Sequence, residues 1–279
     1  MSLEADYRQL TQSAGLAELQ RDTVEVVGED APGFLDRLLT ITASALPVGG
    51  GSRGFLLEAK GRIRCAFFVA RLGEARFLFD CEAGAGEALM GALDMYHFAE
   101  RLEFKVPEET LSAVQGPGSA ALLASLPGGR VPIPRDRCGL GGVDLWGDPI
   151  EGPRLSVAAL ELVRVEQGVP CAPNEYNAES SPLEVSGLEG ITDAKGCYPG
   201  QEVIERTLSL GRPPRALVKL ALDAPLAVPA QLTLDGVAAG TLTSCVSHPD
   251  GRVLGLALIK RKRLEAPEYR CGDVTARPR

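Results

Sequence analysis

One cysteine stands in a setting that favours thiol chemistry. The segment 195–202 reads Lys-Gly-Cys-Tyr-Pro-Gly-Gln-Glu, with Cys197 directly after Gly196. Residues 198–201 carry proline and glycine at the second and third positions of a turn, which is the pattern of type II. A small residue such as Gly196 lets a ligand approach the backbone closely. The pattern therefore predicts an accessible thiol on a loop.

The neighbours of this thiol favour its ionised form. Lys195 lies two residues before Cys197, and residues 201–209 predict a helix that begins just after the turn. A cation and a helix N-terminus both stabilise a thiolate, which is the nucleophilic form of cysteine. Glu202 could pair with Lys195 or Arg206, or accept a proton. The residues alone equally allow Cys197 to be a small buried apolar side chain, and this alternative stays open.

The remaining cysteines and histidines narrow the chemistry. The chain has seven cysteines and two histidines. The cysteines are widely spaced, with no Cys-x-x-Cys pair, so neither a zinc ribbon nor a redox dithiol is expected. Neither histidine has a partner at ligand spacing, so we expect no metal site. Free thiols, the absence of an apolar signal core in residues 1–15 and the absence of a long apolar run predict a cytoplasmic protein without a membrane span.

Charge and composition exclude some partners. The 279 residues carry a net charge of −8 and are 45% hydrophobic. A dedicated nucleic-acid binder usually has a basic domain or stripe. The one basic run, residues 260–263, follows an apolar stretch and is interpreted as the solvated end of a strand. We expect no direct nucleic-acid contact and a monomeric protein.

The first 212 residues mix strands and helices. Strands are predicted at 24–27, 54–57, 63–69, 76–79 and 111–114, and helices from Asp30 onward, at 87–101, at 119–126 and at 155–167. Residues 116–121 imitate a dinucleotide fingerprint, but Pro117 lacks the amide that would face a pyrophosphate, so a turn is expected there. The segment 135–148 is turn-rich. The segment 171–190 is polar and irregular, and a loop of this length in a compact protein is usually either functional or flexible.

The last part of the chain changes character. Strands are predicted at 216–222, 230–234, 237–246 and 252–259, with hairpin turns at Asp235-Gly236 and Asp250-Gly251. This pattern predicts a small antiparallel barrel or sandwich. We therefore divide the chain into a body, 1–212, and a C-terminal β domain, 213–279.

The segment around Cys197 also matches a known signature. Residues 195–202 resemble the K-G-C-Y-x-G-Q-E motif of the YgfZ family, with Pro199 at the free position. These are folate-binding proteins similar to the T-protein, the aminomethyltransferase of glycine cleavage. Further segments agree with the family in order along nearly the whole chain, namely 26–35, 56–62, 115–117, 164–170 and 240–244.

The resemblance implies a fold, a cofactor and a role. The fold would be α+β, a three-lobed folate-binding body of mixed sheets and helices around a central channel, with a C-terminal antiparallel β-barrel. The cofactor would be tetrahydrofolate or a one-carbon derivative, and the partners would be iron–sulfur client enzymes. The resemblance assigns Cys197 and Lys195 to catalysis. It assigns the following residues to cofactor binding: Gly196, Tyr198, Gly200, Gln201 and Glu202.

One departure from the transferase pattern matters for function. Aminomethyltransferases carry an acidic residue after the early hairpin, where this chain has Arg64-Cys65. We therefore expect an accessory factor for the assembly or maintenance of iron–sulfur proteins, with glycine cleavage absent. The alternatives are a folate-dependent one-carbon transferase, which an acidic residue in the channel would support, and a scaffold in which Cys197 is buried and inert.

Overall fold

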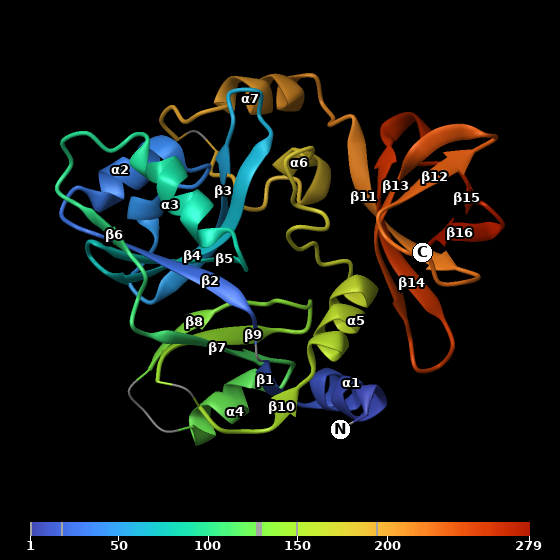
Figure 1. Cartoon of the computed structure of the whole chain (residues 1–279), viewed down its shortest axis with the longest axis horizontal. Helices are drawn as coiled ribbons and strands as arrows, with labels where there is room; N and C mark the ends of the chain where they lie inside the picture. Colours follow the sequence, from blue (N-terminus) through green and yellow to red (C-terminus); the bar gives the residue numbers. More distant parts are fainter. Residues whose placement is uncertain (1, 18, 127–129, 149, 194) are drawn as a thin grey trace.

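The computed structural model describes residues 2–17, 19–126, 130–148, 150–193 and 195–279. Within these ranges the strands form two five-stranded sheets and one closed barrel, which occupy three parts of the molecule (Figure 1). The predicted α+β class with a C-terminal antiparallel barrel is confirmed. The boundary at residues 212 and 213 remains a proposal, and the first strand of the barrel begins at Arg215.

The first sheet is antiparallel in the order β3-β4-β5-β2-β6. Its strands are β2 (Arg21–Val27), β3 (Gly50–Leu57), β4 (Ile63–Gly73), β5 (Arg76–Glu82) and β6 (Glu103–Lys105). The helices α2 (Ala31–Leu38) and α3 (Gly86–Asp94) pack on it, and a short 3₁₀ turn spans Ala43–Ala45. Phe34 of α2 and Phe67, Phe77 and Phe79 of the sheet are buried in one apolar cluster.

The helix predicted at 87–101 is shorter than expected. It ends at Asp94, and the chain then turns toward β6. The carboxylate of Glu100 accepts hydrogen bonds from the backbone amides of Phe98 and Ala99. Such local side-chain bonds offer the backbone an alternative to the helix, so the prediction beyond Asp94 was wrong.

The second sheet has the order β10-β1-β7-β9-β8. Its strands are β1 (Gly15–Ala17), β7 (Thr110–Gln115), β8 (Val131–Pro134), β9 (Gly142–Gly147) and β10 (Arg154–Leu155). Helices α1 (Leu3–Gln12), α4 (Ser119–Ser125) and α5 (Val157–Gln167) belong to this part of the chain. The turn and short helix predicted at 116–126 are confirmed. Strand β9 lies within the segment 135–148, which was predicted to be turn-rich.

The barrel closes in the order β11-β14-β13-β12-β15-β16. Its strands are β11 (Arg215–Leu222), β12 (Ala230–Leu234), β13 (Val237–Ser247), β14 (Val253–Lys260), β15 (Tyr269–Cys271) and β16 (Val274–Pro278), and a 3₁₀ turn spans Arg261–Arg263. Asp235 and Gly236 both have positive φ, 52° and 74°, as a tight hairpin turn requires. Apolar side chains from all around the wall fill the interior, including Leu220, Leu242 and Tyr269.

A buried polar network ties the body to the barrel. Arg164 of α5 donates to Glu175 Oε2 at 3.2 Å and to Ser244 Oγ of β13 at 2.8 Å. The other oxygen of Glu175 accepts from Thr243 and Ser244 at 2.6 and 2.7 Å. A buried ion pair is stable only when its remaining hydrogen-bonding groups are also satisfied, as they are here. The network therefore fixes the loop that follows α5 against the barrel.

Candidate functional site

The loop that carries Cys197 is held by the turn before helix α7 (Gln201–Ser209). Gly200 has φ 80° and ψ −2°, the values of the third residue of a type II turn, which confirms the predicted turn geometry. A Cβ atom at Gly200 would lie 2.5 Å from the backbone oxygen of Glu58. A Cβ atom at Gly61, in the same β3–β4 hairpin, would lie 3.0 Å from the Cβ atom of Val203. The start of α7 therefore packs directly on this hairpin.

Lys195 fastens the loop on its other side. Its Nζ atom donates to the carbonyl oxygens of Leu39 and Ile41, at 2.5 and 2.6 Å, just beyond the end of α2. It also lies 5.2 Å from the centre of the Tyr198 ring. Burial lowers the pKa of Lys195 to about 8, partly opposed by the charge of Asp36. Its visible contacts therefore position the loop.

Cys197 is the exposed member of the seven cysteines. It borders two surface hollows. One, of about 500 Å³, is lined by aromatic side chains that include Phe34, Tyr96 and Phe98, and Phe98 is 86% exposed. The other is lined by polar residues of α7, including Glu202 and Glu205. The alternative in which the Cys197 side chain is buried is therefore wrong.

The other residues assigned to the site surround this cysteine. Gly196 and Glu202 are exposed, whereas Tyr198 is buried in a core cluster with Ile204. Burial, with a smaller contribution from Glu205, raises the pKa of Tyr198 to about 12. Gln201 accepts a hydrogen bond from the Tyr198 amide and donates to Glu205. The signature thus builds a rigid loop that displays one thiol.

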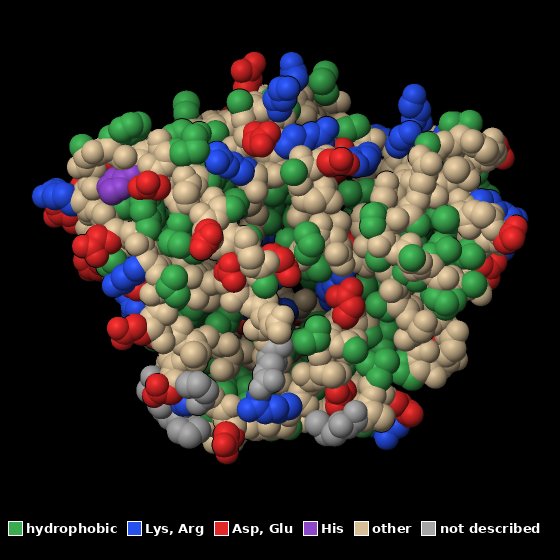
Figure 2. Space-filling view, viewed as in Figure 1, with side chains coloured by type: hydrophobic (Ala, Val, Ile, Leu, Met, Phe, Trp, Pro, Cys, Tyr) green, Lys and Arg blue, Asp and Glu red, His purple; other side chains and the backbone are tan. Residues whose placement is uncertain are grey.

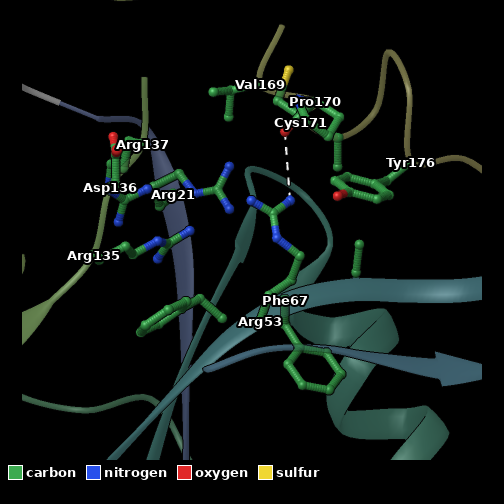
Figure 3. Close-up of a pocket in the computed structure, with 13 residues that line it drawn as sticks. Arg21, Arg53, Phe67, Arg135, Asp136, Arg137, Val169, Pro170, Cys171 and Tyr176 are labelled. Atoms are coloured by element: carbon green, nitrogen blue, oxygen red, sulfur yellow. Dashed lines mark hydrogen bonds between the residues drawn. The ribbon is translucent and has the colours of Figure 1, made fainter. Parts of the chain in front are cut away.

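A second candidate site lies among the parts of the body. The central region of the molecule is hollowed in the space-filling view (Figure 2). Four arginines line a pocket there, together with aromatic and apolar residues: Arg21, Arg53, Arg135, Arg137, Phe67 and Tyr176. Figure 3 shows these side chains gathered around one space, with Val169, Pro170 and Cys171 along another side. Cys197 does not line this pocket.

Two buried carboxylates hold these arginines in place. Arg137 donates to Asp80 at 3.0 Å and to Asp144 at 2.7 Å, and Arg135 contacts the same two carboxylates. Arg21 donates to Asp80 at 2.6 Å. Burial alone would raise the pKa of Asp80, but the charges of the three arginines outweigh it and hold that pKa well below the usual range. Neither Asp80 nor Asp144 lines the pocket, whereas all three of these arginines do.

Other titratable groups of the pocket have different environments. Burial raises the pKa of Cys171 to about 12, partly opposed by Arg164, so this thiol is neutral at physiological pH. Asp136 also lines the pocket, and its Oδ1 atom accepts from the amides of residues 138 to 140. Neither Arg64 nor Cys65 lines the pocket, because Arg64 is exposed and Cys65 is buried in the sheet core.

Sequence reasoning missed the pocket residues. The arginines and Tyr176 come from segments far apart in the chain: β2, β3, the loop after β8 and the loop after α5. The one local signal was the irregular segment 171–190, which contains Tyr176 and was predicted to be either functional or flexible. The structure brings the signature residues together on the surface and places them outside the pocket.

The described part of the chain was also searched for metal and membrane features. In residues 2–17, 19–126, 130–148, 150–193 and 195–279, no three histidine, cysteine or acidic side chains group as metal ligands would. Over the same residues, no helix is long and apolar enough to cross a membrane.

Comparison with known proteins agrees with the fold and with the resemblance to the YgfZ family. Residues 1–131 match the family model of the GCVT N-terminal domain. The chain is 21% identical to the tRNA-modifying protein YgfZ of Photobacterium profundum, over 90% of this chain and 84% of that protein. The first 131 residues are thus similar to a GCVT N-terminal domain, and most of the chain is similar to YgfZ. The resemblance inferred from the signature is thereby confirmed.

The chain is also similar to proteins with other names. It is 26% identical to the mitochondrial iron–sulfur cluster assembly factor IBA57 of Mus musculus, over 88% of this chain and 77% of that protein. It is 36% identical to the chloroplastic protein At1g60990 of Arabidopsis thaliana, over 44% of this chain, and the match spans only 29% of that protein.

A solved structure shares the fold. The aminomethyltransferase T of the glycine cleavage system from Bartonella henselae superposes with a TM-score of 0.84 and 22% identity, over 99% of this chain and 88% of that one. The agreement covers both sheets and the barrel of this chain. It establishes the architecture and carries no statement about activity.

Proposed function

We propose that this protein binds tetrahydrofolate, or a one-carbon derivative, and serves as an accessory factor in the assembly or maintenance of iron–sulfur proteins. The observation that carries the proposal is the exposed thiol of Cys197 on a loop fastened at both ends, in a chain similar to YgfZ and IBA57. Its partners would be folate and iron–sulfur client enzymes, and its location the cytoplasm.

The central pocket is compatible with a folate. Folate combines aromatic rings with glutamate carboxylates, so its site needs aromatic or apolar walls and cations. The pocket supplies Phe67 and Tyr176 as walls, and Arg21, Arg53 and Arg135 as cations. Guanidinium groups bind carboxylates through paired N–H donors. The residues present therefore suit the cofactor, and the bound folate would supply one-carbon chemistry.

Cys197 would act outside this pocket. The Cys197 thiol lies on the surface beside an aromatic hollow, where a partner protein can reach it. The Cys171 thiol lines the pocket, but its raised pKa keeps it neutral and therefore a poor nucleophile. We propose that Cys197 and Lys195 form the catalytic part of the signature, with Cys197 reacting as a thiolate and Lys195 holding its loop. The following residues were predicted to bind the cofactor but do not line the pocket proposed for folate, so their proposed role is to shape the Cys197 loop: Gly196, Tyr198, Gly200, Gln201 and Glu202.

Complementation tests the role of the thiol. A cell strain that lacks its own protein of this kind should recover iron–sulfur enzyme activity with the wild-type chain. Cys197→Ser keeps the size of the side chain but loses an easily ionised group, so it should fold normally and fail to restore activity. Cys271→Ser, in the barrel, is the matched control and should restore it. Full restoration by Cys197→Ser would refute the proposed role of the thiol.

A transferase is the second candidate function. The observation in its favour is Asp136, an acidic residue that lines the central pocket. Its Oδ1 atom is engaged by three backbone amides, which suits a turn-stabilising carboxylate as well as a reactive one. We expect no glycine cleavage. Formation of methylenetetrahydrofolate from an aminomethyl-lipoyl carrier, and its loss in Asp136→Asn, would favour the transferase instead.

A further inference from the structure

A group of cations lies where helix α7 leads into the barrel. The 3₁₀ turn Arg261–Arg263 is held against the linker, because Arg261 donates from its backbone amide to Pro214 O at 2.8 Å and from Nε to Pro213 O at 2.7 Å. Arg212 directly precedes these prolines. Figure 2 shows Lys and Arg side chains along the upper edge of the molecule, where Figure 1 places α7 and the start of β11. Six residues form this basic patch: Arg206, Arg212, Lys260, Arg261, Lys262 and Arg263.

The patch keeps its positive charge because acidic side chains do not pair with it. Within the part of the chain that the structure describes, none of the six cations forms an ion pair. Lys260 donates to the carbonyl of Ala238, and Arg261 donates to that of Pro213. One acidic residue, Glu265, follows the basic run. In a chain whose net charge is −8, this local excess of cations stands out as a surface for a negatively charged partner.

Two exposed leucines lie among these cations. Leu208 is 43% exposed and Leu210 is 79% exposed, and both stand between Arg206 and Arg212 in the sequence. A single exposed leucine is ordinary on a protein surface. Two of them between unpaired cations give a surface that is both apolar and positive. Its complement is a partner surface with acidic and apolar side chains side by side.

An acidic protein segment suits this surface better than a nucleic acid or a membrane does. Proteins that bind single-stranded nucleic acids stack the bases on aromatic side chains, and none of the patch residues is aromatic. An anionic bilayer attracts basic segments, but the net charge of −8 opposes the approach of the whole chain. Two leucines also offer little apolar area for insertion into a bilayer.

We propose that the basic patch, with Leu208 and Leu210, docks an acidic and partly apolar segment of the partner protein that reacts at Cys197. The identity of this partner rests on the proposed function. Helix α7 has nine residues and is therefore about 13 Å long, with Cys197 just before its N-terminal end and the patch at its C-terminal end. A segment docked on the patch thus holds the partner within reach of the thiol.

The charges along α7 set the direction of the docked segment. Glu202 and Glu205 lie in the N-terminal half of the helix, next to Cys197, whereas Arg206 and the rest of the patch lie beyond them. Like charges across an interface repel, so the acidic part of the partner is kept at the patch and away from the thiol.

A peptide titration tests the surface on the full chain. The probe is a labelled synthetic helical peptide with leucine along one face and glutamate beside it, followed by fluorescence anisotropy. The comparison probes are the same peptide with glutamine in place of glutamate, a single-stranded oligouridine, and vesicles of phosphatidylcholine and phosphatidylserine. The acidic peptide should bind, and its binding should weaken as the salt concentration rises, because exposed charges are screened.

Two patch variants and one control locate the binding. Arg212→Glu with Lys262→Glu, and separately Leu210→Ser, should each weaken the acidic peptide on the order of tenfold. Arg8→Glu with Arg279→Glu changes the net charge by the same amount at exposed positions in α1 and at the C-terminus, and it should bind as the wild type does. Because all these side chains are exposed, the melting temperatures should match that of the wild type.

Some results of the titration would overturn the docking surface. No binding of the acidic peptide, equal binding of its glutamine version, or equal affinity in the patch variants and the control would each do so. Tighter binding of the oligouridine or of the vesicles than of the peptide would overturn the assignment to a protein partner.

Complementation separates this inference from the proposed function. Arg212→Glu with Lys262→Glu should restore iron–sulfur enzyme activity poorly, and the control pair should restore it fully. Full restoration by the patch variant, with none by Cys197→Ser, would overturn the docking surface and leave the proposed function intact. Poor restoration by the patch variant, with full restoration by Cys197→Ser, would support the docking surface and refute the role of the thiol. Full restoration by both would refute the two proposals together.

Discussion

Replacing Gly200 by alanine should loosen the Cys197 loop, because two separate costs meet at that position. The residue has φ 80°, where an L side chain costs about 1–2 kcal/mol. The new Cβ would also lie 2.5 Å from the Glu58 carbonyl oxygen, so the backbone of the β3–β4 hairpin must move. Overpacking of this kind adds roughly 1–3 kcal/mol. The expected destabilisation is therefore about 2–5 kcal/mol.

Two other glycines separate these costs. Gly211 has φ 90° and open space around its Cβ position, so Gly211→Ala should cost only the conformational part, about 1–2 kcal/mol. Gly196 has open space and no positive φ, so Gly196→Ala should stay within about 0.5 kcal/mol.

Thermal unfolding of the three variants measures the effect. At about 2–4 °C per kcal/mol, Gly200→Ala should melt roughly 4–20 °C below the wild type. It should also react faster at Cys197 with a thiol reagent, since the loop loses its support. If Gly200→Ala is no less stable than Gly211→Ala, the account of how the hairpin holds this loop is wrong.

Three further predictions follow from other contacts. In the native protein, Cys197 should be the first cysteine alkylated by iodoacetamide, since it is the exposed one, and peptide mass spectrometry that finds it unlabelled until unfolding would contradict this. Arg164→Met should lower the free energy of unfolding, measured in urea, by about 3–5 kcal/mol, because it leaves the buried Glu175 without its cation. Adding Glu175→Gln should recover part of that loss. A loss below about 1 kcal/mol for Arg164→Met alone would contradict this prediction. The lowered pKa of Asp80 stabilises the fold fully at pH values above the unfolded-state pKa of about 3.9, and this stabilisation is lost as the pH falls below that value. Asp80→Asn should therefore make the free energy of unfolding depend less on pH on the acid side. An unchanged pH dependence would refute this assignment.

Local chemistry made part of the fold predictable. The turn at 198–201, the start of α7 and the hairpin at Asp235-Gly236 each depend on residues adjacent in sequence. Proline restricts the backbone angles at its own position, and glycine widens them. Their effect on a turn can therefore be predicted without knowing the rest of the fold. The strands that were not predicted depend on partners distant in the sequence. Strand β9 pairs with β7 and β8, and the short strands β15 and β16 complete the closed barrel.

The candidate site residues also fall into those that the sequence could predict and those that it could not. The signature identified Cys197 and its neighbours, because their chemistry is local. It could not show that Lys195 contacts the carbonyls after α2, since Leu39 lies 156 residues earlier in the chain. The arginine pocket was invisible for the same reason, because an isolated Arg21 or Arg135 in the sequence is indistinguishable from a surface arginine. Only the packing of two sheets and a loop makes them one site.

Titration of the full chain with a reduced folate tests the central claim most directly. The account predicts saturable binding of 5-formyltetrahydrofolate to the wild-type chain and to Cys197→Ala, because the thiol lies outside the pocket that would hold the folate. It also predicts weaker binding to Arg53→Gln. The absence of heat with any reduced folate, under conditions where the chain is folded, would contradict the proposed function.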